Sequence, residues 1–445
     1  MTRAGAIASG FLFALILTLF AAEVRAQEGG VQAGYVGLPA RASPAGDGGL
    51  VVGEGSRLHA GVGAEMGYDS NVFYQPNGAL SSPILRVLPF LDLTNQQAPQ
   101  NAQPLAVGVV YDLQASLLYR HLFSDDARID ASSIRDTFSP SASGLLDFSS
   151  NQRLGLTISD NFNRSEEAPY TPGRAEIIRN SNLAAAQAHW SPGGGRIQGS
   201  LRYSNEVDIY EGDYRLDRNI DNEVMLDLSW RWFPKTALYV NVTQGFIRYL
   251  DDSQSNRDSN PLRAKAGIRG LVTEKLSAGL SAGYAAGFYR DGTNPQGFGT
   301  LSVSAETIWR PTFLTAVSLA YRHDFQNSII SHYYNVDSVH LAVRHAVENR
   351  VIVSAFGHYE NRRYDSPARL DPNMPLANTG PTRTDNVTGA GLAADYYLRY
   401  WAYAGIGYNL VTSSSNAAFV DTTSGQTVSA DFVKQQVFAR VGLTY

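Results

Sequence analysis

Apolar and polar residues alternate with a period of two along most of the chain after Arg57, and runs with a helical period are absent there. The alternation is clearest at the end. From Val433 to Tyr445 one set of alternate positions is largely apolar and the other is largely polar. Successive side chains of a β-strand point to opposite faces, so residues 433–445 are predicted to form a strand with one apolar and one polar face.

This strand runs to the last residues of the sequence, Val441, Leu443 and Tyr445. Termini usually fray unless they are tied down, so such an ending is unusual for a soluble domain. The pattern resembles the C-terminal insertion signal of bacterial outer-membrane β-barrels, which also closes the barrel against its first strand. We therefore expect Val441, Leu443 and Tyr445 to serve as an insertion signal, with a row of similar strands upstream.

The same alternation predicts about 18 strands, an even number as single-chain bacterial barrels have. Pro89 and Pro140 fall inside the second and fourth of them, where a missing N–H argues against a continuous strand. The predicted strands are residues 57–68, 84–94, 106–120, 134–148, 152–163, 180–190, 196–209, 220–232, 236–249, 261–272, 276–289, 298–309, 313–325, 334–346, 351–364, 383–398, 401–410 and 433–445.

The connections between these segments predict an all-β, antiparallel, up-and-down transmembrane barrel. Short turns follow the even-numbered strands and longer polar loops mostly follow the odd ones, as expected for periplasmic turns and outer loops. A soluble sandwich with one solvated face is the alternative, but a closed barrel disposes of the edges of so many long strands. A barrel of 16 strands is the alternative count.

Aromatic residues agree with this orientation, because tryptophan and tyrosine favour membrane interfaces. Tyr119, Tyr210, Tyr249, Tyr289, Tyr333 and Tyr364 lie near the long loops. The tryptophans predicted to form the opposite belt, near the short turns, are Trp190, Trp230, Trp232, Trp309 and Trp401.

Composition narrows the class further. The 445 residues include no Cys and carry a net charge of −5, which excludes a disulfide framework and gives no basic footprint for nucleic acid. Residues 1–26 are predicted to be a cleaved signal peptide, with Arg3, an apolar run and a small-x-small site ending at Ala26. Residues 27–56 are predicted to be a flexible periplasmic linker and residues 57–445 the barrel in the outer membrane of a Gram-negative bacterium.

A barrel of this size leaves room for a water-filled lumen, and no segment is long enough to form a separate plug. The predicted lumen-lining residues are Arg202, Glu206, Glu223, Asp227, Arg231, Arg263, Lys265, Arg269, Glu306, Arg322, Asp324, Arg344, His358, Glu360 and Arg440. Such a wall suits hydrated polar solutes; alternatively these charges pair with one another and only hold the shape of the barrel.

Catalysis is not expected. His323 and Asp324 are neighbours in sequence and should face opposite sides of a strand. His332, His345 and His358 belong to no nucleophile or ligand motif. We expect no catalytic residue, no metal site and no cofactor, although acidic loop residues such as Asp69 or Asp251 could bind a cation.

The first predicted strand and its loop carry the most specific motif, Tyr68-Asp69-Ser70-Asn71-Val72-Phe73, followed by Leu85 to Leu93. These residues resemble the β-barrel porin type 2 family, especially the form found in myxobacteria. The resemblance runs from about His59 to Tyr445. It implies an outer-membrane barrel, for which no catalytic or binding residues are established.

Some members of that group are encoded with Wzx/Wzy-type polysaccharide machinery, as Wzp-like barrels that serve a periplasmic export protein. The resemblance therefore implies a conduit for polysaccharide export. The alternatives are a general diffusion porin for small polar solutes and a non-conducting structural or adhesive barrel. The expected partners are outer-membrane lipid and lipopolysaccharide, the barrel assembly machinery and a periplasmic polysaccharide export protein, but not nucleic acid.

Overall fold

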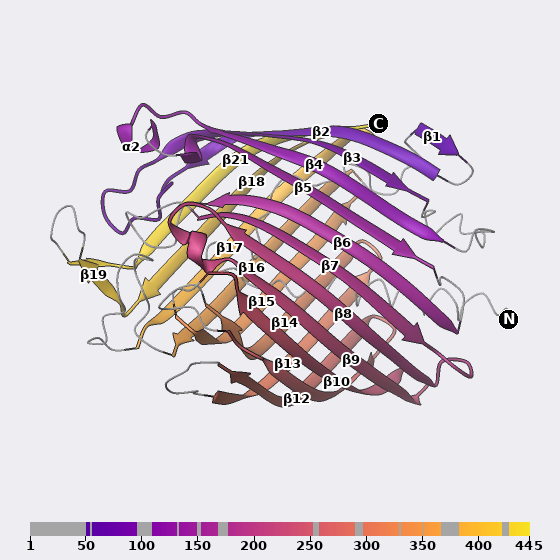
Figure 1. Ribbon diagram of the computed structural model, residues 1–445. Coiled ribbons are helices and arrows are strands. Elements are labelled where there is room, and N and C mark those ends of the chain that lie inside the picture. The colour runs from indigo at the N-terminus through magenta and orange to yellow at the C-terminus, as the bar shows by residue number, and fades with distance from the viewer. Residues whose placement is uncertain are drawn as a thin grey trace.

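The computed structural model shows a closed antiparallel barrel (Figure 1). It describes residues 50–53, 56–95, 109–130, 133–148, 153–167, 177–251, 258–289, 297–328, 331–348, 350–365, 382–420 and 427–445. Each wall strand pairs with the next along the chain, and the last strand, β21, pairs with the first, β2. The wall has 18 strands, as the sequence predicts.

Nine of the wall strands lie in the first part of the chain and nine in the second. The first nine are β2 (Ser56–Asp69), β3 (Ser82–Thr94), β4 (Val110–Leu122), β5 (Asp136–Asp147), β6 (Leu154–Glu167), β7 (Ile177–Trp190), β8 (Ile197–Tyr210), β9 (Asn219–Phe233) and β10 (Thr236–Tyr249). The other nine are β11 (Leu262–Leu271), β12 (Leu276–Phe288), β13 (Gly297–Thr312), β14 (Thr315–Asn327), β15 (Tyr333–Val347), β16 (Val351–Tyr364), β17 (Thr384–Arg399), β18 (Ala402–Ser415) and β21 (Phe432–Thr444).

The alternation in the sequence becomes the two faces of this wall. On β9, Leu226, Leu228 and Trp230 are 40%, 45% and 41% exposed, because they point away from the barrel. Asp227 and Ser229, which alternate with them, point inward and are more buried. An apolar outside and a polar inside are what a barrel surrounded by lipid requires.

Several strands extend further at the long-loop end than the apolar alternation predicts. β6 continues to Glu167 and β18 to Ser415. In these extensions both faces of the strand carry polar residues, such as Arg164 and Ser413. Backbone pairing continues there, although the outward side chains no longer mark an apolar face. At the opposite end, the turn predicted at residues 310–312 lies at residues 313–314 instead.

The two prolines are tolerated inside their strands. The β3–β4 pairing skips Leu88 and Pro89, so the missing N–H falls at a local break. Pro140 pairs with Leu117 of β4 but lies just beyond the last residue of β5 that pairs with β6. The strand predictions are confirmed at both places, and the prolines mark where pairing with one neighbour stops.

The end of the predicted linker is not without structure. Leu50-Val51-Val52 forms a short strand, β1 (Leu50–Gly53), that pairs with the start of β2. An apolar, β-branched run favours such pairing. The signal peptide and the rest of the linker lie outside the described residues.

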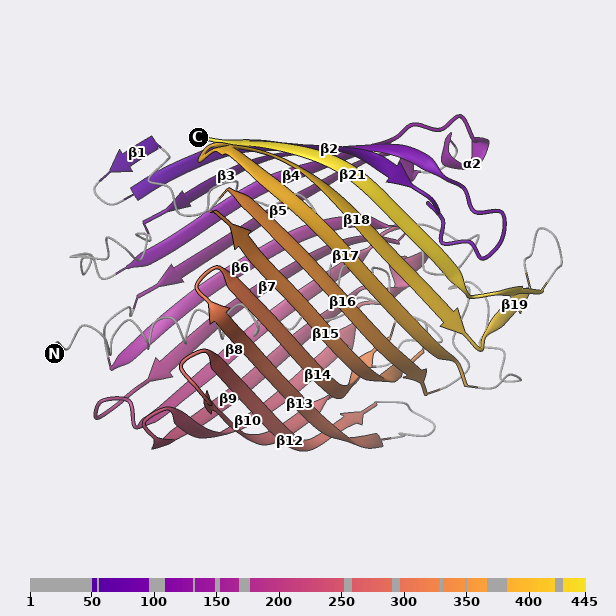
Figure 2. The same cartoon turned by 180° about the vertical axis from the view of Figure 1, so that it is seen from behind.

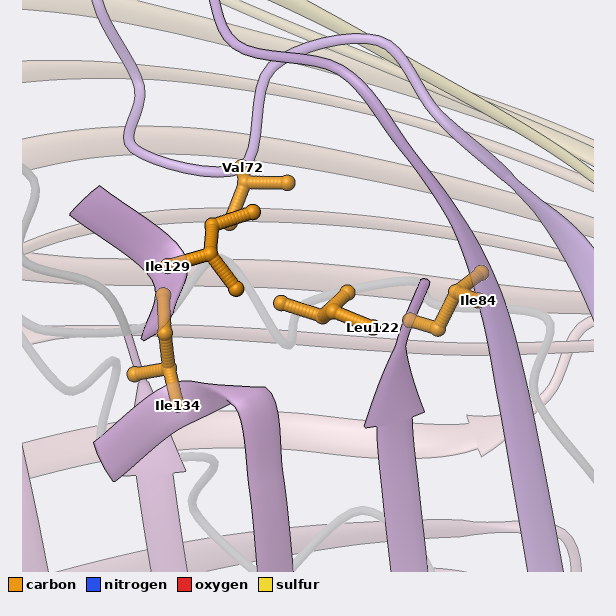
Figure 3. Close-up of a cluster of buried hydrophobic side chains, with 5 residues drawn as sticks. All are labelled: Val72, Ile84, Leu122, Ile129 and Ile134. Carbon is orange, nitrogen blue, oxygen red and sulfur yellow. The ribbon is translucent and has the colours of Figure 1, made fainter. Parts of the chain in front are cut away.

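The long loops gather at one end of the barrel and the short turns at the other, where the C-terminus also lies (Figures 1 and 2). The loops after β2 and β4 share a small apolar core, with α2 (Ala127–Asp130) and η1 (Ser133–Arg135) (Figure 3). Its buried members are Val72, Ile84, Leu122, Ile129 and Ile134.

Two further elements lie near this end. η2 (Gly212–Asp217) follows β8, and β19 (Ala418–Val420) pairs with β20 (Thr427–Ser429) in a hairpin that extends beyond the ends of the wall strands (Figure 2). No helix among the described residues is long and apolar enough to cross a membrane.

Candidate functional site

The inner face of the wall is the candidate functional site. All of the residues predicted to line a lumen occupy positions opposite in alternation to the exposed apolar ones. Asp227 pairs in register with Asn241, which pairs with Lys265, so these side chains share one face across three strands. Their role in the passage of solutes stays a prediction.

Arg440 and Asp395 form the best-defined ion pair of this face. The guanidinium of Arg440 donates to both carboxylate oxygens of Asp395, at 2.7 and 2.6 Å. The two residues belong to β21 and β17, and only Gly405 of β18 lies between them. A Cβ at Gly405 would lie 2.2 Å from Asp395 Oδ1, so the glycine leaves the space in which the pair forms.

Asp324 of β14 joins two cations of β11. Arg263 Nε lies 3.3 Å from its Oδ1 and Lys265 Nζ 3.1 Å from its Oδ2. These contacts cross β12 and β13, where the facing positions Gly283 and Ser302 are small. Pairs that skip strands in this way neutralise charge that the wall buries.

Other predicted residues pair more locally or have no carboxylate partner. Arg362 holds Glu360 at 2.9 and 2.7 Å, and Arg269 lies 3.5 Å from Asp227. Among the described residues, no carboxylate lies within 4.0 Å of Arg202, Arg231 or Arg344. In the part of the chain that the structure describes, the inner wall therefore combines neutralised pairs with arginines that contact no carboxylate.

The sequence reasoning missed several inner-face partners. Asp395, Arg86 and Lys434 were not among the predicted residues, although each forms an ion pair on this face. The alternation already places them inward, so extending the period-two assignment to every strand would have found them. The described residues contain no group of three or more His, Cys, Asp or Glu side chains that could hold a metal ion.

The Tyr68–Phe73 motif lies where the barrel closes. Lys434 of β21 donates to Asp69 Oδ2 at 2.8 Å and to the carbonyl of Asn71 at 3.0 Å. Asn71 Nδ2 donates to the carbonyls of Gln75 and Val433, at 2.7 and 3.0 Å. We call Asp69, Asn71 and Lys434, all buried, the closure clasp.

Ser70 adds two hydrogen bonds to the same junction. Its N–H donates to the carbonyl of Gln435 at 2.9 Å, and its hydroxyl accepts from the N–H of Gln435 at 2.8 Å. Val72 belongs to the apolar core of the loops, against which Phe73 packs. The motif therefore fastens the first strand and its loop to the last strand.

The residues predicted to guide insertion and to mark the membrane interface face outward. Val441, Leu443 and Tyr445 are 53%, 49% and 70% exposed. Thr444 N–H donates to the carbonyl of Trp401 at 2.8 Å, so the last strand ends beside a short turn. The tryptophans are also exposed on the outer face, namely Trp190, Trp230, Trp232, Trp309 and Trp401. Their roles in insertion and at the interface stay predictions.

The predicted tyrosine belt at the long-loop end needs correction. Tyr210, Tyr289 and Tyr364 are buried, because their side chains point toward the inside of the barrel and not toward its outer face. Tyr119 of the predicted set does point outward, and it and three other tyrosines donate their hydroxyls to an Asp or Asn of the next strand. These hydrogen bonds are Tyr119 to Asp136, Tyr203 to Asn222, Tyr321 to Asp337 and Tyr359 to Asn386, at 2.7–2.9 Å.

Two histidines contact carboxylates on the outer face. His121 lies 2.7 Å from Asp136, and His323 lies 2.7 Å from Asp337. His323 and Asp324 face opposite sides of β14, as expected, because Asp324 binds Arg263 and Lys265 inside. The hydroxyl that contacts His323 is that of Thr300, at 3.4 Å, which is long for transfer of a proton from a nucleophile.

A closed barrel of 18 antiparallel strands, apolar outside and polar inside, defines an outer-membrane β-barrel of porin type. The chain belongs to the family described as Putative beta-barrel porin 2, whose profile matches residues 58–429. The predicted family is confirmed, as is the outer membrane of a Gram-negative bacterium as its location. Porins of this kind are generally not enzymes.

Solved structures of outer-membrane proteins are similar in shape. OpdK of Pseudomonas aeruginosa shares 9% identity with a TM-score of 0.45, covering 87% of this chain and 99% of that chain. OccAB4 of Acinetobacter baumannii shares 9% with a TM-score of 0.47, covering 87% and 98%. The FrpB iron transporter of Neisseria meningitidis shares 8% with a TM-score of 0.44, covering 87% and 82%. No curated protein matches the sequence.

Proposed function

We propose that this barrel conducts hydrated polar solutes across the outer membrane, and that its cargo is a surface or secreted polysaccharide delivered by a periplasmic export protein. The observation that supports a conduit is the inner wall, where charges of both signs face the interior and many are neutralised in pairs. A hydrated chain of sugars can slide past such a wall by exchanging hydrogen bonds with it.

Three arginines have no carboxylate partner among the described residues, and they favour an acidic cargo. Arg202 and Arg231 lie on neighbouring strands toward the short-turn end, and Arg344 lies near that end of β15. A guanidinium binds carboxylate or phosphate through two parallel hydrogen bonds, which makes these positions suited to anionic groups. The export assignment rests on this chemistry and on the family resemblance.

General diffusion of small polar solutes is the alternative, because the same wall would serve it. A non-conducting barrel is less favoured. The hairpin of β19 and β20 extends beyond the barrel and does not fold into it. Residues 366–381, the other loop that could fill the interior, lie outside the described residues.

Two measurements separate these functions. Purified protein in planar bilayers should remain closed without its periplasmic partner if it exports polysaccharide, whereas steady large conductance identifies a diffusion porin. A strain lacking the gene should lose one surface or secreted polysaccharide. If that strain displays all its polysaccharides, export is excluded, and conductance alone then decides between a porin and a closed barrel.

We further propose that the chain has no catalytic activity. Conversion of His323 or His121 to Ala should leave the polysaccharide phenotype unchanged, because neither histidine reaches the inner wall. Hydrolysis of outer-membrane lipid or ester substrates by purified protein, lost in either variant, would contradict this.

A further inference from the structure

The wall is not evenly paired all the way round. β5 begins at Asp136 and β6 continues to Glu167, yet their pairing covers only Ser141–Asp147 with Thr157–Asn163. In contrast, β6 pairs with β7 over its whole length, and β5 pairs with β4 from Asp136 onward. Residues 136–140 and 164–167 therefore diverge at the long-loop end, and we call this place the β5–β6 seam.

An arginine bridges the seam in place of backbone pairing. Arg120 lies on the inner face of β4, and its guanidinium donates to the carbonyl of Glu166 on β6 at 3.1 Å. The contact passes over β5, whose Pro140 has no N–H to give. Arg120 thus ties β6 to β4 across β5, at the end where β5 and β6 are not paired.

β13 and β14 also diverge at one end, and there an aromatic side chain occupies the space between them. Their pairing ends at Val303 and His323, although β13 begins at Gly297 and pairs there with β12. Phe325 fills this place and is 1% exposed. Its ring meets Phe298 at 4.9 Å between centroids, and its carbonyl accepts from Arg263 at 2.8 Å.

β4 and β14 carry the same sequence repeat, Leu-x-Tyr-Arg-His-x-Phe, at residues 117–123 and 319–325. Both tyrosines and both histidines contact an aspartate of the next strand in the same way. The phenylalanines differ, because Phe123 is 44% exposed where Phe325 is buried. The copy in β14 therefore places a buried ring at the β13–β14 divergence, whereas the phenylalanine of the copy in β4 stays exposed.

The two faces of the β5–β6 seam have different chemistry. Inward positions on β5 and β6 next to the seam carry hydroxyl and amide groups, such as Ser139, Ser141 and Asn163, whereas the inward Asp147 lies at the opposite end of β5. The outer face carries Phe138 on the β5 side, 54% exposed, whose ring lies 5.0 Å from that of Tyr119, and the ion pair of Arg164 with Glu166 on the β6 side, at 2.8 Å. Exposed aromatic rings of this kind are typical of the level where lipid meets water.

We propose that the β5–β6 seam is a lateral portal for an amphiphile with an uncharged polar headgroup and an apolar tail. The headgroup bonds to the hydroxyl and amide groups inside while the tail passes between β5 and β6 into the lipid, and Arg120 holds the seam closed at rest. The portal does not depend on the cargo of the axial channel.

A photoactivatable dodecyl maltoside tests the portal in purified full-length protein reconstituted into liposomes. The chain has no Cys, so each variant can carry one introduced pair of cysteines and no others. Ser139→Cys with Ser165→Cys, bridged by a short bismaleimide, ties the diverging residues. Ser143→Cys with Asn161→Cys, bridged alike, is the matched control within the paired part of the same strands.

The expected result is photolabelling of inward residues of β5 and β6 in the wild type, lost on bridging the seam pair and retained on bridging the control pair. Arg120→Ala should increase the labelling. The portal is refuted if labelling persists in the bridged seam variant. It is also refuted if residues of β13 and β14 are labelled as strongly as those of β5 and β6, or if only outward residues are labelled. Heat-dependent gel mobility verifies that every variant is folded.

Discussion

The closing junction between β21 and β2 and the seam between β5 and β6 are opposites. β21 and β2 are joined only through space, yet they pair over nine residues from Gly61 to Asp69, and the buried closure clasp adds to that pairing. β5 and β6 are consecutive in the chain, yet they pair over seven residues, with Arg120 beyond them.

The difference follows from chain connectivity. Consecutive strands meet at small entropic cost because a short connection keeps them close, whereas the first and last strands must find each other across the whole chain. The closing junction therefore needs strong and specific contacts. The β5–β6 seam is kept together by its connection and can lose part of its pairing without opening the barrel.

Removal of Leu443–Tyr445 should have the largest effect on the closing junction. Tyr445 exchanges two backbone hydrogen bonds with Ala60, and Thr444 donates to Trp401. Without them the end of β21 is unpaired and the predicted insertion signal is removed, so we expect no assembled barrel. Heat-modifiable barrel in outer-membrane fractions measures this, with deletion of Leu50–Val52 as the control. Normal amounts of the truncated protein would contradict the closing role.

Breaking the closure clasp should be the next largest effect. Lys434→Met leaves Asp69 buried without its cation, and loss of one partner of a buried pair costs about 3–5 kcal/mol. Denaturant unfolding in liposomes measures the change. Lys434→Met combined with Asp69→Leu should recover part of the loss, because no lone charge remains. Equal stability of the single variant and the wild type would show that the clasp is not stabilising.

The contrast between the two junctions also separates what the sequence could predict from what it could not. The order, number and approximate limits of the wall strands follow from the period-two alternation, which membrane and lumen impose on every strand. Their outer ends do not, because Arg164 and Ser413 are polar where pairing continues. Pro89 and Pro140 suggested poor strands, whereas they mark local breaks in pairing with one neighbour.

The side-chain contacts of the inner face depend on the register between neighbouring strands, which cannot be read from a single sequence. The alternation places Arg440 inward, but its partner Asp395 meets it only because Gly405 lies between them. The tyrosines near the loops were assigned to the belt by their place along the chain. The side of the strand on which a tyrosine lies also matters, because Tyr203 points outward and Tyr210 points inward. The role of the Tyr68–Phe73 motif likewise needed the position of Lys434.

Two glycines offer a smaller test of the comparison. A Cβ at Gly67 would lie 2.3 Å from the carbonyl oxygen of Val437 and 2.8 Å from Phe438 Cβ, within the closing junction. Gly67→Ala should cost about 1–3 kcal/mol, as overpacking does. Gly144→Ala in β5 is the matched variant, because its Cβ would meet only Leu113 Cδ2, at 3.3 Å. Equal unfolding free energies for the two variants would remove the distinction in packing.

The smallest expected effect is a pH dependence confined to the β6 side of the seam. Glu211, in the segment after β8, accepts hydrogen bonds from Arg164 and Asn180 at 2.6 and 2.8 Å. The hydrogen bond from Arg164 holds the pKa of Glu211 below its usual 4.5. The stabilisation that ionised Glu211 provides is therefore complete above pH 4.5 and is lost as the pH falls through the lowered pKa.

Hydrogen exchange of residues 164–167, expressed as protection factors, measures this. Protection should fall on acidification in the wild type and should be lower and less dependent on pH in Glu211→Gln. The loss should be partial, because Glu166 also binds Arg164, at 2.8 Å, and because Glu211 is substantially exposed to solvent. Residues 436–440 of the closing junction serve as the internal control and should keep their protection over the same range. A parallel loss at both places would mean that acid loosens the whole barrel and that the seam has no separate stability.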